Sequence, residues 1–199
     1  MTQPPTDPAA LRREMRARRA GLSPALRIGA AQRIAERLHA LPGLPGEGYA
    51  AGYWAVGGEA ALHAWQIALP PGLVYCLPVL CEDDVLRFAP WRAGDTLVAN
   101  RFGIPEPDVA RSSLLSASEL ALAVVPLVAF DADCHRIGMG GGWYDRTFAA
   151  RVGNPGPPLL VGAAYEIQRV PRIDPAPWDV RLDAVCTEAA TYLRDDPSA

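Results

Sequence analysis

The sequence predicts a single α/β domain of three layers, α/β/α, with a central, largely parallel sheet between the helices. Short apolar runs, which are typical of buried strands, alternate along the chain with segments of helical periodicity. The connections between these runs are long enough for the crossovers that parallel strands require. With 199 residues, of which 50% are hydrophobic and 21% charged, the chain can bury one sizeable core.

One folded unit is expected to fill most of the chain. Residues 1–8 are proline-rich and predict a disordered lead-in. We expect residues 9–194 to form the domain and residues 195–199 to be a tail. No internal repeat or low-complexity block interrupts the predicted domain.

Two helices are expected at the start of the domain. Leu11, Met15 and Leu22 recur at roughly helical spacing with arginines between them, which indicates a first helix with a basic outer face. Ser23 and Pro24 then provide an N-cap and a proline at the first helical position. An apolar stripe of helical spacing follows them and predicts the second helix.

Strands and further helices are expected in the rest of the chain. Apolar runs predict strands at residues 49–54, 73–77, 85–88, 120–125, 159–164 and 182–186. Helices are expected at 59–68 and 143–150. Residues 101–111 contain two prolines and predict an irregular connection that could close over a site.

The charged residues restrict the possible chemistry. All 19 basic residues are arginines, which excludes a Schiff base, a lysine general base and the lysine-bearing P-loop. A phosphate must therefore be held by arginines, backbone amides or a metal. The net charge of −3 provides no global positive field for nucleic acid, and no nucleic-acid partner is expected.

The cysteines and the apolar runs favour a soluble cytoplasmic protein. No C-x-x-C pair is present and the three histidines are scattered, so a structural zinc site is not expected. The longest apolar run, 120–130, contains a proline and is too short to span a bilayer, and no membrane partner is expected. The N-terminus lacks the apolar region of a signal peptide. We expect a monomer with reduced, mostly buried thiols.

The most informative segment is a glycine-rich loop between an apolar strand and a short helix. Glycines allow backbone amides to approach a phosphate without a Cβ clash, and a helix N-terminus adds partial positive charge. A tight strand-to-helix turn is the alternative interpretation. Gly138, Gly140 and Gly142 alternate along the loop, so the spacing differs from the dinucleotide-binding fingerprint.

Charged residues beside the loop favour an anion site with a metal. Arg136 and Arg146 flank the glycines, and Asp145 lies in the first turn of the following helix. Arginines bind phosphate, and a carboxylate beside them can hold a divalent cation. These three residue types together are consistent with nucleotide phosphates and a metal in one place.

The segment Gly138-Met-Gly-Gly-Gly-Trp-Tyr-Asp-Arg146 resembles the G-x-G-x-G-Y-Y-D-R signature of the 5-formyltetrahydrofolate cyclo-ligase family, with Trp143 at the usual first tyrosine. The lysine that many members have near the N-terminus would fall near Pro8. The resemblance extends over most of the chain, through residues 11–19 with 22–23, 58–59, 100–107, 178–183 and 187–188.

The resemblance implies a three-layer α/β fold and ATP- and Mg²⁺-dependent closure of 5-formyltetrahydrofolate to 5,10-methenyltetrahydrofolate, with release of ADP and phosphate. In the family mechanism, the formyl oxygen attacks the γ-phosphate of ATP. N10 then attacks the activated carbon and expels phosphate. Such a reaction needs mainly positioning and charge neutralisation from the protein.

The resemblance also implies roles for individual residues. The residues implied to bind ATP are Arg12, Arg136, Gly138, Met139, Gly140, Gly141, Gly142, Trp143 and Tyr144. The residues implied to bind the folate are Glu59 and the loop residues from Met139 to Trp143. Arg136, Tyr144 and Asp145 are implied to be catalytic, and Asp145 and Asp179 to be the magnesium carboxylates.

Other interpretations of these residues stay open at the level of sequence. Asp145 could complement a helix dipole, Asp179 could form an Asx turn, and Glu59 could be an N-terminal helix acid. Cys134-His135 could suggest a nucleophile and its base, but adjacent side chains rarely point at each other. The arginine face of the first helix, formed by Arg12, Arg16 and Arg19, is expected to be mostly solvated, and an RNA-binding role for it lacks interleaved aromatics.

A non-enzymatic module is the competing function. Such an α/β domain would sense a nucleotide or phosphorylated metabolite with the same glycine loop. It would need the loop but neither of the two aspartates.

Overall fold

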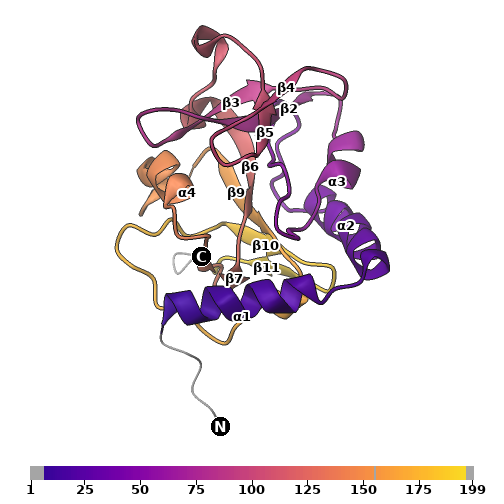
Figure 1. Cartoon of the computed structure of the whole chain (residues 1–199), viewed down its shortest axis with the longest axis vertical. Coiled ribbons are helices and arrows are strands. Elements are labelled where there is room, and N and C mark those ends of the chain that lie inside the picture. The colour runs from indigo at the N-terminus through magenta and orange to yellow at the C-terminus, as the bar shows by residue number, and fades with distance from the viewer. Residues whose placement is uncertain (1–6, 155, 196–199) are drawn as a thin grey trace.

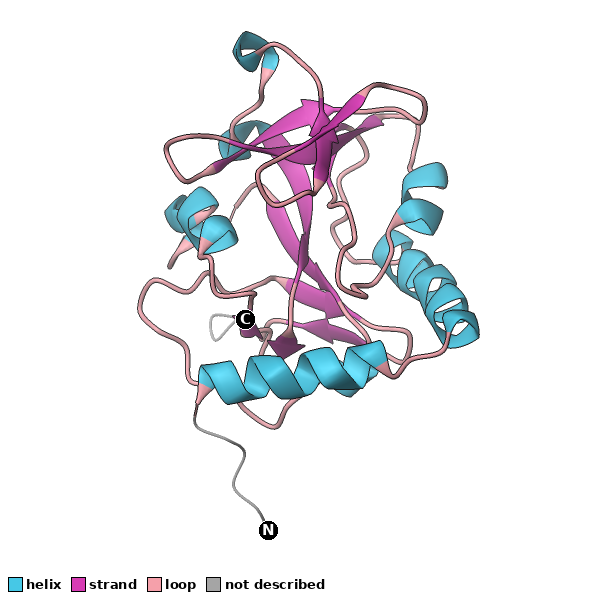
Figure 2. Ribbon diagram, in the orientation of Figure 1, coloured by secondary structure: helices cyan, strands magenta, loops and turns pink. Residues whose placement is uncertain are grey.

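The computed structural model describes residues 7–154 and 156–195 (Figures 1 and 2). Its α-helices are α1 (Pro8–Ala20), α2 (Pro24–His39), α3 (His63–Ile67) and α4 (Trp143–Thr147). Its strands are β1 (Gly48–Ala51), β2 (Leu73–Leu80), β3 (Leu86–Pro90), β4 (Leu97–Ala99), β5 (Pro105–Pro107), β6 (Leu120–Pro126), β7 (Ala129–Phe130), β8 (Arg136–Ile137), β9 (Leu159–Ala163), β10 (Ala184–Cys186) and β11 (Thr191–Leu193). Short 3₁₀ helices lie at Arg111–Ser113, Ala117–Glu119, Ala149–Arg151 and Glu166–Gln168.

Seven of the strands form one mixed sheet in the order β11-β10-β9-β6-β1-β2-β3. The four inner pairings, from β10 to β2, are parallel. The two edge strands, β3 and β11, pair antiparallel with their neighbours. The predicted α/β class with a largely parallel sheet is therefore confirmed.

The central strand β6 shows how the sheet separates two cores. Leu122 and Val124 belong to a cluster that includes residues of α2 and α3. Ala123 and Val125 belong to a second cluster that includes α4 residues. Because successive strand side chains point to opposite faces, β6 is buried on both sides, as its continuous apolar run predicts. Helices therefore lie on both faces of the sheet, as expected.

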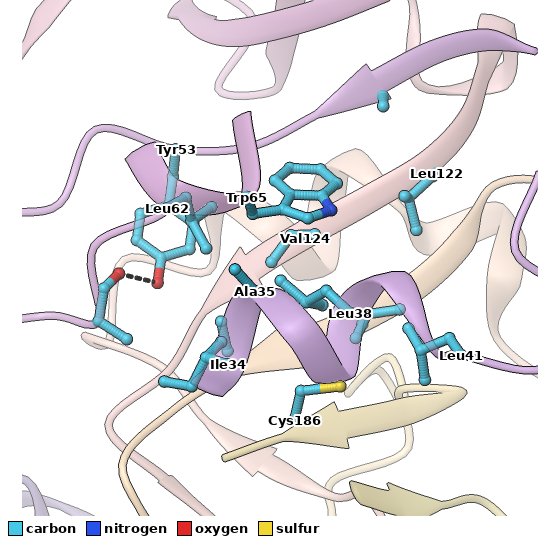
Figure 3. Packing of buried hydrophobic residues seen from close by; sticks show 14 of the residues in the cluster. Ile34, Ala35, Leu38, Leu41, Tyr53, Leu62, Trp65, Leu122, Val124 and Cys186 are labelled. Carbon is cyan, nitrogen blue, oxygen red and sulfur yellow. Dashed lines mark hydrogen bonds between the residues drawn. The ribbon is translucent and has the colours of Figure 1, made fainter. Parts of the chain in front are cut away.

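Helix α2 packs its apolar stripe against the sheet beside α3 (Figure 3). Ile34 and Leu38 are at most 1% exposed, and so is Trp65 of α3. The ring centroid of Trp65 lies 5.9 Å from that of Tyr75 on β2. Full burial of one such apolar side chain is worth about 1.5–3 kcal/mol, so this stripe is a main source of stability.

Helix α1 begins one residue earlier than the predicted lead-in allows. The Asp7 carboxylate accepts hydrogen bonds from the first-turn amides, and Pro8 is the first helical residue. Leu11 and Met15 bury their side chains in a third cluster, whereas Leu22 lies beyond the end of the helix. The lead-in before Asp7 and the tail after residue 195 lie outside the described residues.

Several expected elements differ in the structure. The helix expected at 59–68 was wrong in extent, because α3 begins only at His63 and two positive-φ glycines hold the preceding residues in a turn. The helix expected at 143–150 ends at Thr147 and is followed by a 3₁₀ turn. The segment 101–111 is less irregular than predicted, since β5 pairs with β4. The edge strand β11 and the small hairpins were not anticipated.

Among the described residues, no helix has both the length and the apolar character to cross a bilayer. The longest, α2, has 16 residues and carries charged side chains on its outer face.

Candidate functional site

The glycine loop connects β8 to α4 and requires glycine at two positions. Gly140 has a φ of +98° and Gly142 a φ of +67°, values that side-chain-bearing residues rarely adopt. A Cβ on Gly140 would lie 3.5 Å from the guanidinium carbon of Arg12, and one on Gly142 would lie 2.6 Å from Nη1 of Arg146. Two arginines, one from α1 and one from α4, therefore lie against the backbone of the loop.

Helix α1 contributes the first of these arginines. Nε of Arg12 donates a 2.8 Å hydrogen bond to the carbonyl of Gly138, and Nη2 of Arg16 lies 3.4 Å from the sulfur of Met139. Arg13, the next residue in the chain, is exposed. The structure therefore places Arg12, predicted to bind ATP, beside the predicted ATP loop. Helix α4 has only five residues, so the positive charge at the loop comes mainly from arginines and little from a helix dipole.

An ion pair connects the two ends of the loop. Nη2 of Arg136, a residue that is 8% exposed, lies 2.7 Å from Oδ1 of Asp145. The same oxygen accepts a hydrogen bond from the amide of Val180, at 3.2 Å. Asp145 is thereby next to the chain segment that contains Asp179, as its expected shared role requires. Oδ2 of Asp179 accepts a 2.8 Å hydrogen bond from the amide of Ala176, three residues earlier. This bond closes a turn backwards along the chain, so it is not the Asx turn that the sequence permits, in which the side chain bonds to a later amide.

Glu59 lies in a turn, and not in the first turn of a helix. Its side chain is buried, with the residue 8% exposed, and Oε2 accepts a 3.0 Å hydrogen bond from the amide of Val56. Burial raises the pKa of Glu59, while that hydrogen bond and the charges of Arg19 and Arg16 act in the opposite direction. A buried carboxylate has lost hydrogen bonds from water, so it can recognise a polar heterocycle only if the ligand donates hydrogen bonds in their place.

Two tyrosines lie within electrostatic range of Glu59. The hydroxyl of Tyr53 donates a 2.6 Å hydrogen bond to the carbonyl of Ala60, which fixes the end of the Glu59 turn (Figure 3). Tyr144 of α4 is half-buried. Burial raises the pKa of both phenols, and the Glu59 carboxylate raises them further. Both hydroxyls are therefore neutral donors near neutral pH.

Trp143 is surrounded by cations and a second ring. The guanidinium carbons of Arg101 and Arg146 each lie 5.3 Å from its ring centroid, and the ring of Phe102 meets it edge-on at 6.4 Å. Nε of Arg146 also donates to the carbonyl of Asp84 at 2.8 Å. The first two residues of the 101–111 connection, which was expected to close over a site, therefore lie beside Trp143 of the glycine loop.

One arginine of the first helix contradicts the sequence prediction. The face containing Arg12, Arg16 and Arg19 was expected to be mostly solvated, but Arg19 is only 1% exposed. Its spacing of four residues from the buried Met15 could have indicated this. The basic face is therefore divided into an exposed part, a part on the glycine loop and a part in the protein interior.

Comparison with known proteins agrees with this arrangement. A family model described as the 5-formyltetrahydrofolate cyclo-ligase family matches residues 6–188. The chain belongs to this family.

Relatives named as 5-formyltetrahydrofolate cyclo-ligases resemble parts of the chain. A 5-formyltetrahydrofolate cyclo-ligase of Escherichia coli is 37% identical over 118 residues, which are 58% of this chain and 64% of that protein. One of Haemophilus influenzae is 39% identical over 108 residues, 53% of this chain and 57% of that protein. The matched segments thus span less than two thirds of either relative.

Two solved structures share the fold of this chain over nearly its whole length. The NMR structure of Aquifex aeolicus 5,10-methenyltetrahydrofolate synthetase covers 96% of this chain and 95% of its own, with a TM-score of 0.80 and 26% identity. A synthetase structure from Mycoplasma pneumoniae, 22% identical, has the same fold, with a TM-score of 0.71 over 92% of this chain and 99% of its own.

The reactive or metal-binding side chains around the turn between β7 and β8 have structural roles in this chain. Burial raises the pKa of Cys134 to about 12, so its thiol is no nucleophile beside His135. Ligand atoms of Asp131, Asp133 and His135 lie within 4.8 Å of one another. The Asp131 carboxylate, however, already accepts hydrogen bonds from three backbone amides and lies 3.2 Å from Nδ1 of His135. It organises the turn between β7 and β8.

Sequence reasoning missed the roles of three residues near the glycine loop or the Glu59 turn, where contacts between distant segments place Tyr53, Arg19 and Arg101. Arg19 had a signal in its spacing from Met15, and Arg101 had one because it begins the connection expected to lie over a site. Tyr53 had none.

Proposed function

We propose that the chain catalyses the ATP-dependent closure of 5-formyltetrahydrofolate to 5,10-methenyltetrahydrofolate, with release of ADP and phosphate. The formyl oxygen attacks the γ-phosphorus and ADP departs. N10 then attacks the activated carbon, loses its proton and expels phosphate. Family membership and the fold similarity support this activity.

The glycine loop between two arginines carries the proposal. The space on the bare side of Gly140 and Gly142 is bordered by the guanidinium groups of Arg12 and Arg146, and any side chain there would meet them. Exposed backbone with positive φ and arginines on both sides suits the phosphates of a nucleotide. In a chain without lysine, these are the cations that can neutralise the transferred phosphoryl group.

The residues present also fit a magnesium ion. Asp145 and Asp179 each use one carboxylate oxygen in the contacts described above, and the other oxygen of each has no hydrogen-bond partner among the described residues. One or two carboxylates together with substrate phosphates are the usual protein environment of Mg²⁺. When bound there, the ion would neutralise charge on the nucleotide phosphates.

The folate is proposed to bind where the Glu59 turn faces α4. The Glu59 carboxylate would accept hydrogen bonds from the polar edge of the pterin, and the neutral hydroxyl of Tyr144 would donate to the formyl group. Met139 and Trp143 would contact the folate from the loop. Arg136, held by Asp145, would face the developing negative charge.

A direct assay tests the proposal. We expect purified protein to convert 5-formyltetrahydrofolate to the methenyl product, followed by its near-UV absorbance, only when ATP and a divalent cation are both present. Matched reactions without ATP, or with a chelator, should give no product. Nucleotide binding without turnover under all of these conditions would instead support the sensing module.

A further inference from the structure

The buried arginine of α1 contacts the turn that carries Glu59. Nη2 of Arg19 donates a 2.9 Å hydrogen bond to the carbonyl of Gly57, and Nη1 lies 3.4 Å from the carbonyl of Leu127. Nε is buried without a partner among the described residues. An arginine that is 1% exposed and only partly hydrogen-bonded is costly, so its position needs a reason beyond docking the helix.

The contacted turn has little freedom of its own. Gly57 and Gly58 have φ values of +56° and +77°. A Cβ on Gly58 would lie 2.5 Å from Nη1 of Arg27 in α2. Nη2 of Arg27 in turn donates to the carbonyl of Arg19 at 2.7 Å, and its Nε to that of Leu22 at 3.0 Å. Arg19 is thus hydrogen-bonded to the turn, Arg27 lies against Gly58, and the two arginines are connected to each other.

The groups that face Glu59 come from several elements. Besides the buried Arg19, they are Arg16 of α1, Tyr53 after β1, Tyr144 of α4 and Tyr165 after β9, whose hydroxyl lies 3.4 Å from the Glu59 carbonyl. The tyrosines are neutral, so the positive charges near this carboxylate come from α1. Arg16 is exposed and its charge is screened by water, whereas that of Arg19 is not.

We propose that Arg19 is a positioning residue for Glu59, and that it fixes the Gly57 carbonyl and thereby the direction in which the Glu59 carboxylate faces the folate. The inference rests on the proposed function of Glu59. In addition, the buried charge of Arg19 favours the ionised form of a carboxyl whose burial opposes ionisation. Arg19 touches no substrate and acts only through the turn.

Two substitutions of Arg19 and one matched control test this. Arg19→Met keeps an unbranched side chain but shortens it and removes its charge. Arg19→Lys keeps the charge but replaces the planar guanidinium, whose two ends reach the two carbonyls, with a single ammonium. Arg18→Met changes an exposed neighbour paired with Glu14. For each variant we would measure the KM for 5-formyltetrahydrofolate, the KM for ATP and kcat as functions of pH. The titration of Glu59 would be followed in ligand-free protein by carboxyl ¹³C NMR, with Glu59→Gln as the assignment control.

For Arg19→Met we expect the KM for the folate to rise about tenfold, while the KM for ATP changes less than about twofold. Glu59 should titrate at a higher pH than in the wild type. As the pH is lowered, folate binding by the variant should therefore begin to weaken at a higher pH than folate binding by the wild type. Arg19→Lys should restore most of the titration but raise the folate KM about threefold. Arg18→Met should behave as wild type.

A merely structural role would lower the melting temperature of Arg19→Met without moving the Glu59 titration or the ratio of the two KM values, and this result would overturn the inference. If Arg19→Met does not fold, Arg19→Lys provides the test. A folate KM equal to that of the wild type in Arg19→Lys would also overturn the inference. Failure of the proposed function is distinguishable, because wild-type protein would then form no methenyl product. Failure of the folate role of Glu59 alone would leave the folate KM of Glu59→Gln unchanged. The NMR titration tests Arg19 in either case.

Discussion

Removal of the Arg12 guanidinium should weaken ATP binding selectively. Arg12 is half-buried and is joined to the loop by the 2.8 Å bond to the Gly138 carbonyl, and its guanidinium carbon lies 3.5 Å from the position of a Cβ on Gly140. In Arg12→Ala both the proposed phosphate contact and this attachment of the loop are lost. Arg13 is exposed, so Arg13→Ala provides the matched control.

The expected magnitude follows from these contacts. One charge-assisted contact to a phosphate is worth about 1.4 kcal/mol, which corresponds to a tenfold rise in the KM for ATP. Loss of the half-buried hydrogen bond to Gly138 should cost about 1 kcal/mol of folding free energy. For a chain of this length, that cost lowers the melting temperature by roughly 2–4 °C.

Initial rates of methenyl formation at varied ATP and saturating folate give the KM, and calorimetry gives the melting temperature. Arg13→Ala should change neither value. The reasoning would be refuted if Arg12→Ala and Arg13→Ala had equal KM values for ATP. It would be refuted also if Arg12→Ala raised only the KM for the folate, which would assign the helix to the folate tail.

Three further outcomes are expected. Asp145→Asn should lower kcat at least about a hundredfold, because a proposed metal carboxylate is lost. It should also destabilise the fold by about 3 kcal/mol, because Arg136 loses its partner. Unchanged turnover at saturating magnesium would exclude the metal role. Burial raises the pKa of Glu59 in the folded protein, so the wild type loses stability as the pH rises through that pKa. Glu59→Gln should therefore be more stable than the wild type at pH 7, and this advantage should disappear below the ordinary carboxyl pKa. An advantage in thermal melts that does not depend on pH would contradict this. In a thiol titration of the native protein near pH 8, only Cys81 should react rapidly. Burial raises the pKa of each of the other three thiols, Cys76, Cys134 and Cys186, to about 12. More than one rapidly reacting thiol would be inconsistent with the structure.

Local patterns explain which elements could be predicted. The strand at 120–125 and the second helix carry apolar periodicity over enough residues to specify their type, and both are confirmed at nearly the expected bounds. The helix expected at 59–68 was shorter because Gly57 and Gly58 adopt positive φ, which directs the chain into a turn before Glu59. Edge strands such as β11 have only three residues, and their pairing partner is what defines them.

By itself, the sequence determined the fold class, the arginine-only set of cations and the position of the glycine loop that contains Gly140 and Gly142. These properties depend on residue type and on near neighbours. The tertiary structure alone decided that Arg12 contacts the loop while Arg19, seven residues later, is buried beneath the Glu59 turn. The physical reason is that residues seven apart lie on the same face of a helix but about 10 Å apart along its axis. One basic stripe therefore passes over different surroundings, and these are formed by segments more than a hundred residues away, such as Gly138 and Leu127.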